Sequence, residues 1–164
     1  MLEQPIASAS RWLAGTSLSH VLQDVEWLVP AIQTVHIAAV ALLFSSSLLL
    51  TLGVLGRHAR ELPLARTAAR FLPGFYWGLP ALLATGALMI TAEPERALPN
   101  PAFQLKMLLV LTASTVTFAL ARGVRHLPAD GGAGGLARFA AVAALALWLA
   151  ALVAGRFIAY TLVR

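Results

Sequence analysis

The sequence predicts an all-α integral membrane protein, a single domain over residues 1–164 in which four transmembrane helices form an up-down-up-down bundle. Three observations predict this fold class. Hydrophobic residues make up 59% of the chain and charged residues only 12%, too little polar surface for a soluble domain of this length. Four apolar segments are each long enough to cross a hydrocarbon core of ~30 Å as a helix. The links between them are short, which favours antiparallel neighbours.

The four apolar segments are predicted to be helices because lipid offers no hydrogen-bond partners to the backbone. Transmembrane β-strands would need alternating polarity, which these segments lack. The predicted spans cover about 27–56, 71–92, 102–121 and 136–163.

A short amphipathic segment is predicted before the first span, over about 17–27. Its apolar residues recur at helical spacing, with polar residues between them: Leu18, Val21, Leu22 and Val25. Thr16 or Ser17 suits the N-cap, and Trp12 and Trp27 suit interfacial anchors on the outer surface. The alternative is that the first span simply continues outward as one long helix.

The distribution of charge orients the bundle. The first and third links, with Arg138, contain seven arginines and two acidic residues, whereas the rest of the chain has five basic and five acidic residues. Because cytoplasmic loops are rich in Lys and Arg, both links are predicted to be cytoplasmic. The two termini and the 93–101 link then lie on the outer side of an inner-type membrane. The net charge of +5 is thus a sign of topology, with lipid bilayer rather than nucleic acid as the partner.

His36 is the first candidate functional residue because it is the only histidine in a predicted span. It shares a helix face with Gln33. A neutral imidazole in a bundle core can ligate haem iron or relay a proton. The alternative is a structural histidine bonded to Gln33 or to a neighbouring helix. The chain has no cysteine, which excludes a thiolate metal site and an Fe–S cluster.

Two basic residues are predicted at a depth similar to that of His36. Lys106, the only lysine, follows the helix-start pattern of Asn100 as N-cap and Pro101 as first helical residue. The positive charge of Lys106 near the start of a helix therefore opposes the helix dipole, which suggests a functional role for this residue. The alternative is that its long side chain only extends to the membrane interface. Arg156 lies in the fourth span. Three such groups repel one another unless an anion binds among them.

Other residues near this region are candidates for completing a site. The anion would come from the outer link or from the propionates of a haem; the acidic residues of that link are Glu93 and Glu95. Small residues of the second span predict either close helix packing or room for a flat ligand: Gly74, Gly78, Thr85 and Gly86. Aromatic residues would line a pocket or only pack and anchor at interfaces: Trp148, Trp77 and Tyr76.

Several motifs resemble those of an uncharacterised bacterial family of four-helix inner-membrane proteins, a domain of unknown function. They are Trp27-x-x-Pro30-x-x-x-x-x-His36, Leu43-Phe44, Leu52-Gly53-x-Leu55-Gly56, Thr85-Gly86-Ala87-Leu88, Asn100-Pro101-Ala102-Phe103-Gln104-Leu105-Lys106, and Trp148 with Gly155-Arg156-Phe157-Ile158-Ala159-Tyr160. They span about 27–160, and the resemblance implies the architecture.

A more distant resemblance implies chemistry. A histidine in the first span and a lysine that opens a later one are similar to those of HemJ-type protoporphyrinogen oxidases and copper-resistance D-type membrane proteins. The resemblance implies a b-type haem with His36 as the axial ligand and Lys106 as its functional partner. Bis-histidine ligation by one chain is excluded, because His36 is the only histidine in the predicted spans.

These observations predict a haem b-binding membrane oxidoreductase for electron transfer or for oxidation of a small or lipid-soluble substrate. His36 is the predicted metal ligand. Lys106, the candidate catalytic residue, would be the sixth ligand or would anchor a propionate or the substrate. Arg156 would pair with a propionate, Gln33 would support His36, and Trp148 would line the pocket.

The expected partners are a redox protein or a quinone-like substrate, within a homo-oligomer or a larger membrane complex. The alternative function is a cofactor-free accessory or assembly subunit of a membrane complex, with its polar inner face against a partner helix.

Overall fold

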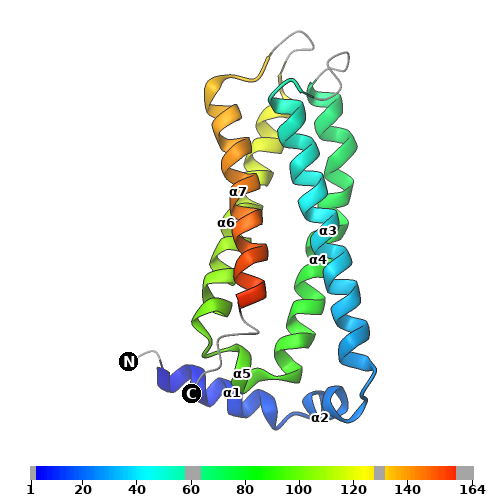
Figure 1. The fold of residues 1–164 in the computed structure, drawn as a ribbon, viewed down its shortest axis with the longest axis vertical. Coiled ribbons are helices and arrows are strands. Elements are labelled where there is room, and N and C mark those ends of the chain that lie inside the picture. Colours follow the sequence, from blue (N-terminus) through cyan, green and yellow to red (C-terminus); the bar gives the residue numbers. More distant parts are fainter. Residues whose placement is uncertain (1–2, 58–63, 128–131, 158–164) are drawn as a thin grey trace.

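The helices of the protein form a tall bundle that stands on a shorter helical layer (Figure 1). The computed structural model describes residues 3–57, 64–127 and 132–157. Within these residues the helices are, in chain order, α1 (Glu3–Ala14), α2 (Ser17–Asp24), α3 (Leu28–Val54), α4 (Leu64–Ala92), α5 (Pro94–Ala97), α6 (Pro101–Arg125) and α7 (Gly135–Phe157). Helices α3, α4, α6 and α7 form the bundle, and α1, α2 and α5 lie across one end of it.

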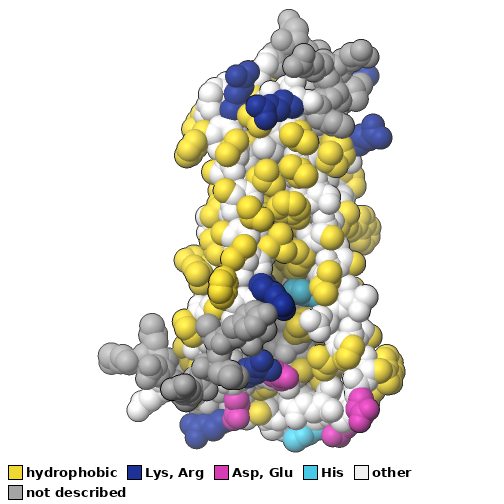
Figure 2. Space-filling model, viewed as in Figure 1, with side chains coloured by type: hydrophobic (Ala, Val, Ile, Leu, Met, Phe, Trp, Pro, Cys, Tyr) yellow, Lys and Arg dark blue, Asp and Glu magenta, His cyan; other side chains and the backbone are white. Residues whose placement is uncertain are grey.

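The four long helices are each long and apolar enough to cross a membrane. Figure 2 shows the corresponding surface, on which hydrophobic side chains form a belt and charged side chains gather toward the two ends. This arrangement confirms the predicted all-α four-helix membrane bundle. Two helices extend beyond their predicted spans, since α4 begins at Leu64 and α6 continues to Arg125. The extensions contain arginines, whose long side chains let a helix continue while their charged groups reach water. Residues 158–163 of the fourth predicted span lie outside the described residues.

The bundle is built from two antiparallel pairs, α3 with α4 and α6 with α7, which meet through α3–α7 and α4–α6 contacts. Glycines of α4 allow the first pair to approach closely. A Cβ atom at Gly74 would lie 2.6 Å from Ser46 Oγ, and one at Gly78 would lie 3.0 Å from Leu43 Cγ. These two glycines therefore serve helix packing and do not leave room for a flat ligand.

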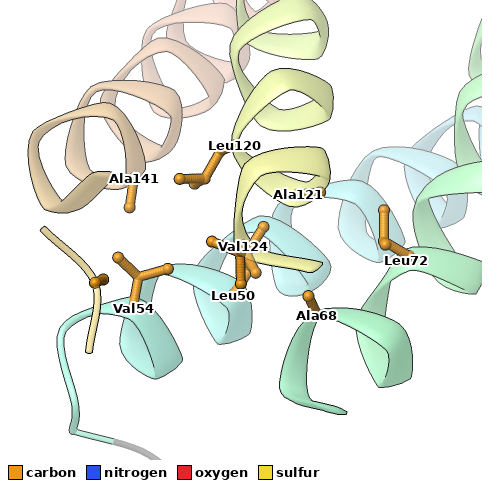
Figure 3. Close-up of a cluster of buried hydrophobic side chains, with 9 residues drawn as sticks. Leu50, Val54, Ala68, Leu72, Leu120, Ala121, Val124 and Ala141 are labelled. Carbon is orange, nitrogen blue, oxygen red and sulfur yellow. The ribbon is translucent and has the colours of Figure 1, made fainter. Parts of the chain in front are cut away.

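The end of the bundle formed by the α3–α4 and α6–α7 links is the arginine-rich end. Exposed arginines surround it: Arg57, Arg66, Arg70, Arg122, Arg125 and Arg138. Figure 3 shows the cluster of buried aliphatic side chains beneath it, contributed by all four long helices and the segment before α7. Thr51 of α3 is buried and donates a hydrogen bond to the carbonyl oxygen of Ala141 in α7 at 3.0 Å. A second cluster, around Phe75 and Trp148, fills the middle of the bundle.

The opposite end is the α1–α2 end. The predicted amphipathic segment is a separate helix, α2, whose N-cap residue Thr16 accepts a hydrogen bond from the backbone N–H of Ser19. The alternative of one long first helix is therefore wrong. Gln23 ties α2 to the bundle by donating to the carbonyl oxygen of Ala92 at 2.9 Å. Trp12 and Trp27 are 74% and 69% exposed, as interfacial anchors must be.

Candidate functional site

His36 lies in α3, about 12 Å along the helix axis from Leu28 at the α1–α2 end. Its Nδ1 atom is 2.9 Å from the hydroxyl oxygen of Thr85 in α4. The ring lies against Gly86 of the same helix, where an added Cβ atom would be 3.5 Å from His36 Cε1. Gly86 therefore leaves space for the imidazole ring, and Thr85 fixes its orientation.

The hydrogen bonds of Thr85 decide which ring nitrogen of a neutral His36 carries the proton. The Thr85 hydroxyl has one proton, and it donates that proton to the carbonyl oxygen of Ala81 at 2.6 Å, one helical turn earlier. A hydroxyl that donates to Ala81 can only accept from His36, so in this arrangement Nδ1 carries the proton and Nε2 keeps its lone pair. Nε2 has no hydrogen-bond partner among the residues that the structure describes. This is the arrangement of a metal-ligating histidine, whose other ring nitrogen donates to a supporting oxygen atom.

Lys106 lies about 8 Å along α6 from Pro101, at the same end of the bundle as His36. The predicted helix start is confirmed, because Asn100 is the N-cap and its side-chain oxygen accepts from the Ala102 N–H at 2.9 Å. The lysine side chain lies against α7, where a Cβ atom at Gly155 would be 3.4 Å from Nζ. Within residues 3–57, 64–127 and 132–157, Lys106 has no hydrogen bond or ion pair.

Two cavities meet at His36 and Lys106. The first, the central cavity, measures about 240 Å³, is lined by residues of α3, α4, α6 and α7, and is partly open to the surface. The second, the lateral cavity, measures about 410 Å³ and lies between α4, α5 and α6. Five residues belong to the walls of both: His36, Leu82, Met89, Lys106 and Val110. His36 and Lys106 are thus within reach of a ligand in either space.

The structure brings two other predicted site residues to the central cavity. Gln33 lines it, but the hydrogen bond expected from Gln33 to His36 is made by Thr85 instead. Trp148 also lines it, is only 2% exposed, and donates its indole N–H to Thr117 Oγ1 at 3.2 Å. These two side chains therefore border the space that His36 faces.

Arg156, the remaining predicted site residue, is not among the residues that line the two cavities. It lies exposed in the last turn of α7. It follows Gly155, whose face of α7 is the one that meets Lys106. Arg156 lies one helical turn after Leu152, which lines the central cavity, so these two residues share a face of α7.

Other predicted pocket residues have different roles. Trp77 is 78% exposed, and Tyr76 contacts Phe118 edge-on with ring centroids 5.5 Å apart; neither lines either cavity. Glu93 lines the lateral cavity, but its carboxylate accepts from Arg96 at 3.0 Å. Glu95 is exposed and lines neither cavity. The acidic residues of this link therefore leave Lys106 without an anionic partner among the described residues.

Sequence reasoning missed the role of Thr85, which was considered only as a small residue for helix packing. Among the described residues no group of three or more His, Cys, Asp or Glu side chains could bind a metal ion. The site instead offers one oriented nitrogen ligand, which suits a cofactor that brings its other ligands with it.

Comparisons with known proteins add no identification. No protein family matches the chain, nor does any curated protein or solved structure. The fold is therefore established as a four-helix membrane bundle from its own geometry, and the resemblances of the sequence motifs remain expectations.

Proposed function

We propose that the protein binds one b-type haem between its four long helices and serves electron transfer or the oxidation of a small or lipid-soluble substrate. The observation that carries the proposal is the hydrogen bond from His36 to Thr85, which leaves Nε2 as a lone-pair donor at the meeting point of the two cavities. A single neutral imidazole is a sufficient protein ligand for haem iron. The haem would supply one-electron redox chemistry when bound.

The other residues of the site suit this assignment. Gly86 makes room for the His36 ring, and Gly155 makes room for the Lys106 side chain. Trp148, Val110 and Leu82 provide apolar walls that exclude water. Lys106 would be the sixth ligand or would anchor an anionic group of the haem or of the substrate.

The proposal includes an orientation in a bacterial inner membrane. All the exposed arginines of the arginine-rich end lie at the end opposite to α1 and α2. Because basic residues near span ends are retained in the cytoplasm, the arginine-rich end faces the cytoplasm. The site of His36 and Lys106 then lies in the outer half of the membrane, within reach of a periplasmic or membrane-embedded redox partner.

Histidine substitution and absorption spectroscopy test the haem assignment. The purified protein from haem-replete cells is expected to show a Soret band at about one haem per chain, and His36→Ala is expected to lose it. His20→Ala and His126→Ala are the matched controls, because both side chains are exposed and line neither cavity. Expression and detergent size profiles of the variants should match those of the parent, so that haem loss is not caused by unfolding.

The outcomes separate the two functions under consideration. Haem retained in His36→Ala but lost in His126→Ala would place the cofactor at the arginine-rich end and refute the site. A colourless parent protein would refute the haem assignment and favour the cofactor-free accessory or assembly subunit, alone or within a larger complex.

A further inference from the structure

The lateral cavity carries one basic group without an acidic partner. Four of its lining residues are ionisable: His36, Glu93, Arg96 and Lys106. Glu93 and Arg96 form an ion pair at 3.0 Å and neutralise each other. His36 Nδ1 is hydrogen-bonded to the Thr85 hydroxyl at 2.9 Å. Lys106 alone remains unpaired among the described residues, so the cavity is complementary to a single negative charge.

The remaining walls of the lateral cavity are apolar and reach the lipid-facing surface. Leu83 and Ala87 contribute from α4, and Phe103 and Met107 contribute from α6. Leu83 is 50% exposed and Met107 is 40% exposed, within a belt of hydrophobic side chains (Figure 2). In a bilayer these side chains contact acyl chains. A ligand in this cavity can therefore keep a hydrocarbon tail in the membrane while its polar head reaches Lys106.

The position of Lys106 selects the kind of head group. The lysine lies about 8 Å beyond the first residue of α6, below the level at which α5 and Asn100 close this end of the bundle. A head group bound at this depth loses its contact with water. The free-energy cost of this desolvation is lowest for a compact monoanion that pairs directly with the ammonium group of Lys106. A quinone head has no charge and would leave Lys106 unpaired. The head of a two-chain phospholipid is held at the membrane surface, above the lysine.

We propose that the lateral cavity binds a single-chain amphiphile with a carboxylate head, of the long-chain fatty acid class. The carboxylate pairs with Lys106 Nζ, and the chain passes between Leu83 and Met107 into the bilayer. Binding of the amphiphile requires no haem. The inference rests on the proposed function only where it takes the bound amphiphile to be the substrate.

Binding of radiolabelled palmitate to the purified full-length protein in a non-ionic detergent tests this inference. Competition by hexadecanol isolates the charge, because the alcohol has the same chain length without a carboxylate. Competition by phosphatidylglycerol tests the two-chain anionic lipid. We expect one palmitate per chain. Hexadecanol should compete at least roughly tenfold more weakly than unlabelled palmitate, because it lacks the charge-assisted pair. Phosphatidylglycerol should also compete at least roughly tenfold more weakly, because its head group is held at the membrane surface.

Two variants locate the site. Lys106→Met removes the charge, and Ala87→Trp fills the cavity from the lipid side; each is expected to weaken palmitate binding roughly tenfold or more. The matched controls are Arg138→Gln at the arginine-rich end and Ala84→Trp, an exposed alanine of the same helix that does not line the cavity. Both controls should bind palmitate like the parent.

The results that would overturn the inference are distinct from those that bear on haem. Equal competition by hexadecanol, tighter binding of phosphatidylglycerol, or equal loss in Ala84→Trp and Ala87→Trp would each refute it. Palmitate binding by a haem-free preparation would support the site while the haem assignment failed. Haem binding without saturable palmitate binding would refute this inference alone.

Discussion

Thr85 and Thr117 use their hydroxyl groups in the same way. Each donates its proton to a carbonyl oxygen one turn earlier in its own helix, Ala81 for Thr85 and Ala113 for Thr117. Each is then left as an acceptor for a ring N–H from another helix. Threonine thereby supplies an oriented acceptor within the membrane without leaving a donor unsatisfied. At His36 the consequence is chemical, because this acceptor determines which ring nitrogen is available to a ligand.

Substitution of Thr85 tests its role as a positioning residue. Thr85→Val keeps the shape but removes the acceptor, so a loss of haem affinity of roughly 10–100-fold is expected, as for other partners of metal-ligating histidines. Thr85→Ser should restore affinity. The measurement is haem titration of the apoprotein, with the haem midpoint potential as a second readout.

Thr91→Val is the matched control for Thr85→Val. Thr91 is also buried in α4 and makes the same type of hydrogen bond, to Ala87, but lines neither cavity. Equal haem affinity and potential in Thr85→Val and the parent protein would show that the His36–Thr85 hydrogen bond does not govern ligation.

At the scale of the helices, the close approach of α3 and α4 depends on glycines at specific positions, where no side chain separates the two helices. Gly78 is buried against Leu43, whose side chain is itself fully buried. Two proline residues, Pro73 and Pro80, are tolerated within α4. Small residues are a common means of helix association in lipid, where hydrophobic attraction between helices is weak.

Gly78→Ala is expected to destabilise the bundle by about 1–3 kcal/mol through overpacking against Leu43. The added methyl group would lie 3.0 Å and 3.2 Å from two carbon atoms of that side chain. Gly123→Ala in α6 is the control, because nothing lies within 4 Å of its added Cβ atom. The control should be neutral or more stable by up to ~1 kcal/mol, since alanine favours helix. Thermal unfolding in detergent measures both; equal stability of the two variants would contradict the packing role of Gly78.

The four spans and their caps could be predicted because they depend on local sequence. Hydropathy over about 20 residues identifies a transmembrane helix, and Asn100 followed by Pro101 marks the start of α6. Helix α1 was not predicted, although it is about as amphipathic as α2. It is formed against α5, a contact between segments far apart in the sequence.

The candidate site could be predicted only in part for the same physical reason. His36 and Lys106 stand out because ionisable groups are rare in spans. The partner of His36 could not be predicted from spacing, because Thr85 lies on another helix and the register between α3 and α4 is set by glycine packing. Arg156 shares its face of α7 with Leu152, which lines the central cavity, but its own side chain is exposed in the last turn of the helix and lines neither cavity.

At the scale of the whole molecule, the two ends differ in both charge and shape. The arginine-rich end carries short links, whereas the α1–α2 end is covered by amphipathic helices with exposed tryptophans (Figure 1). Two features resist inversion of the protein in the membrane. One is an amphipathic helix at one membrane surface, and the other is a set of basic residues at the opposite surface. The asymmetry therefore predicts one orientation for all copies of the chain.

Labelling of single cysteines tests this orientation, and the absence of native cysteine leaves no background. Gly15→Cys and Pro99→Cys, both at the α1–α2 end, are expected to react with an impermeant thiol reagent in intact spheroplasts. Ala65→Cys and Gly132→Cys, at the arginine-rich end, should react only after permeabilisation. All four positions are at least partly exposed, so differences in labelling report sidedness rather than burial. The reverse pattern would place His36 and Lys106 in the cytoplasmic half of the membrane, where a periplasmic redox partner could not reach them.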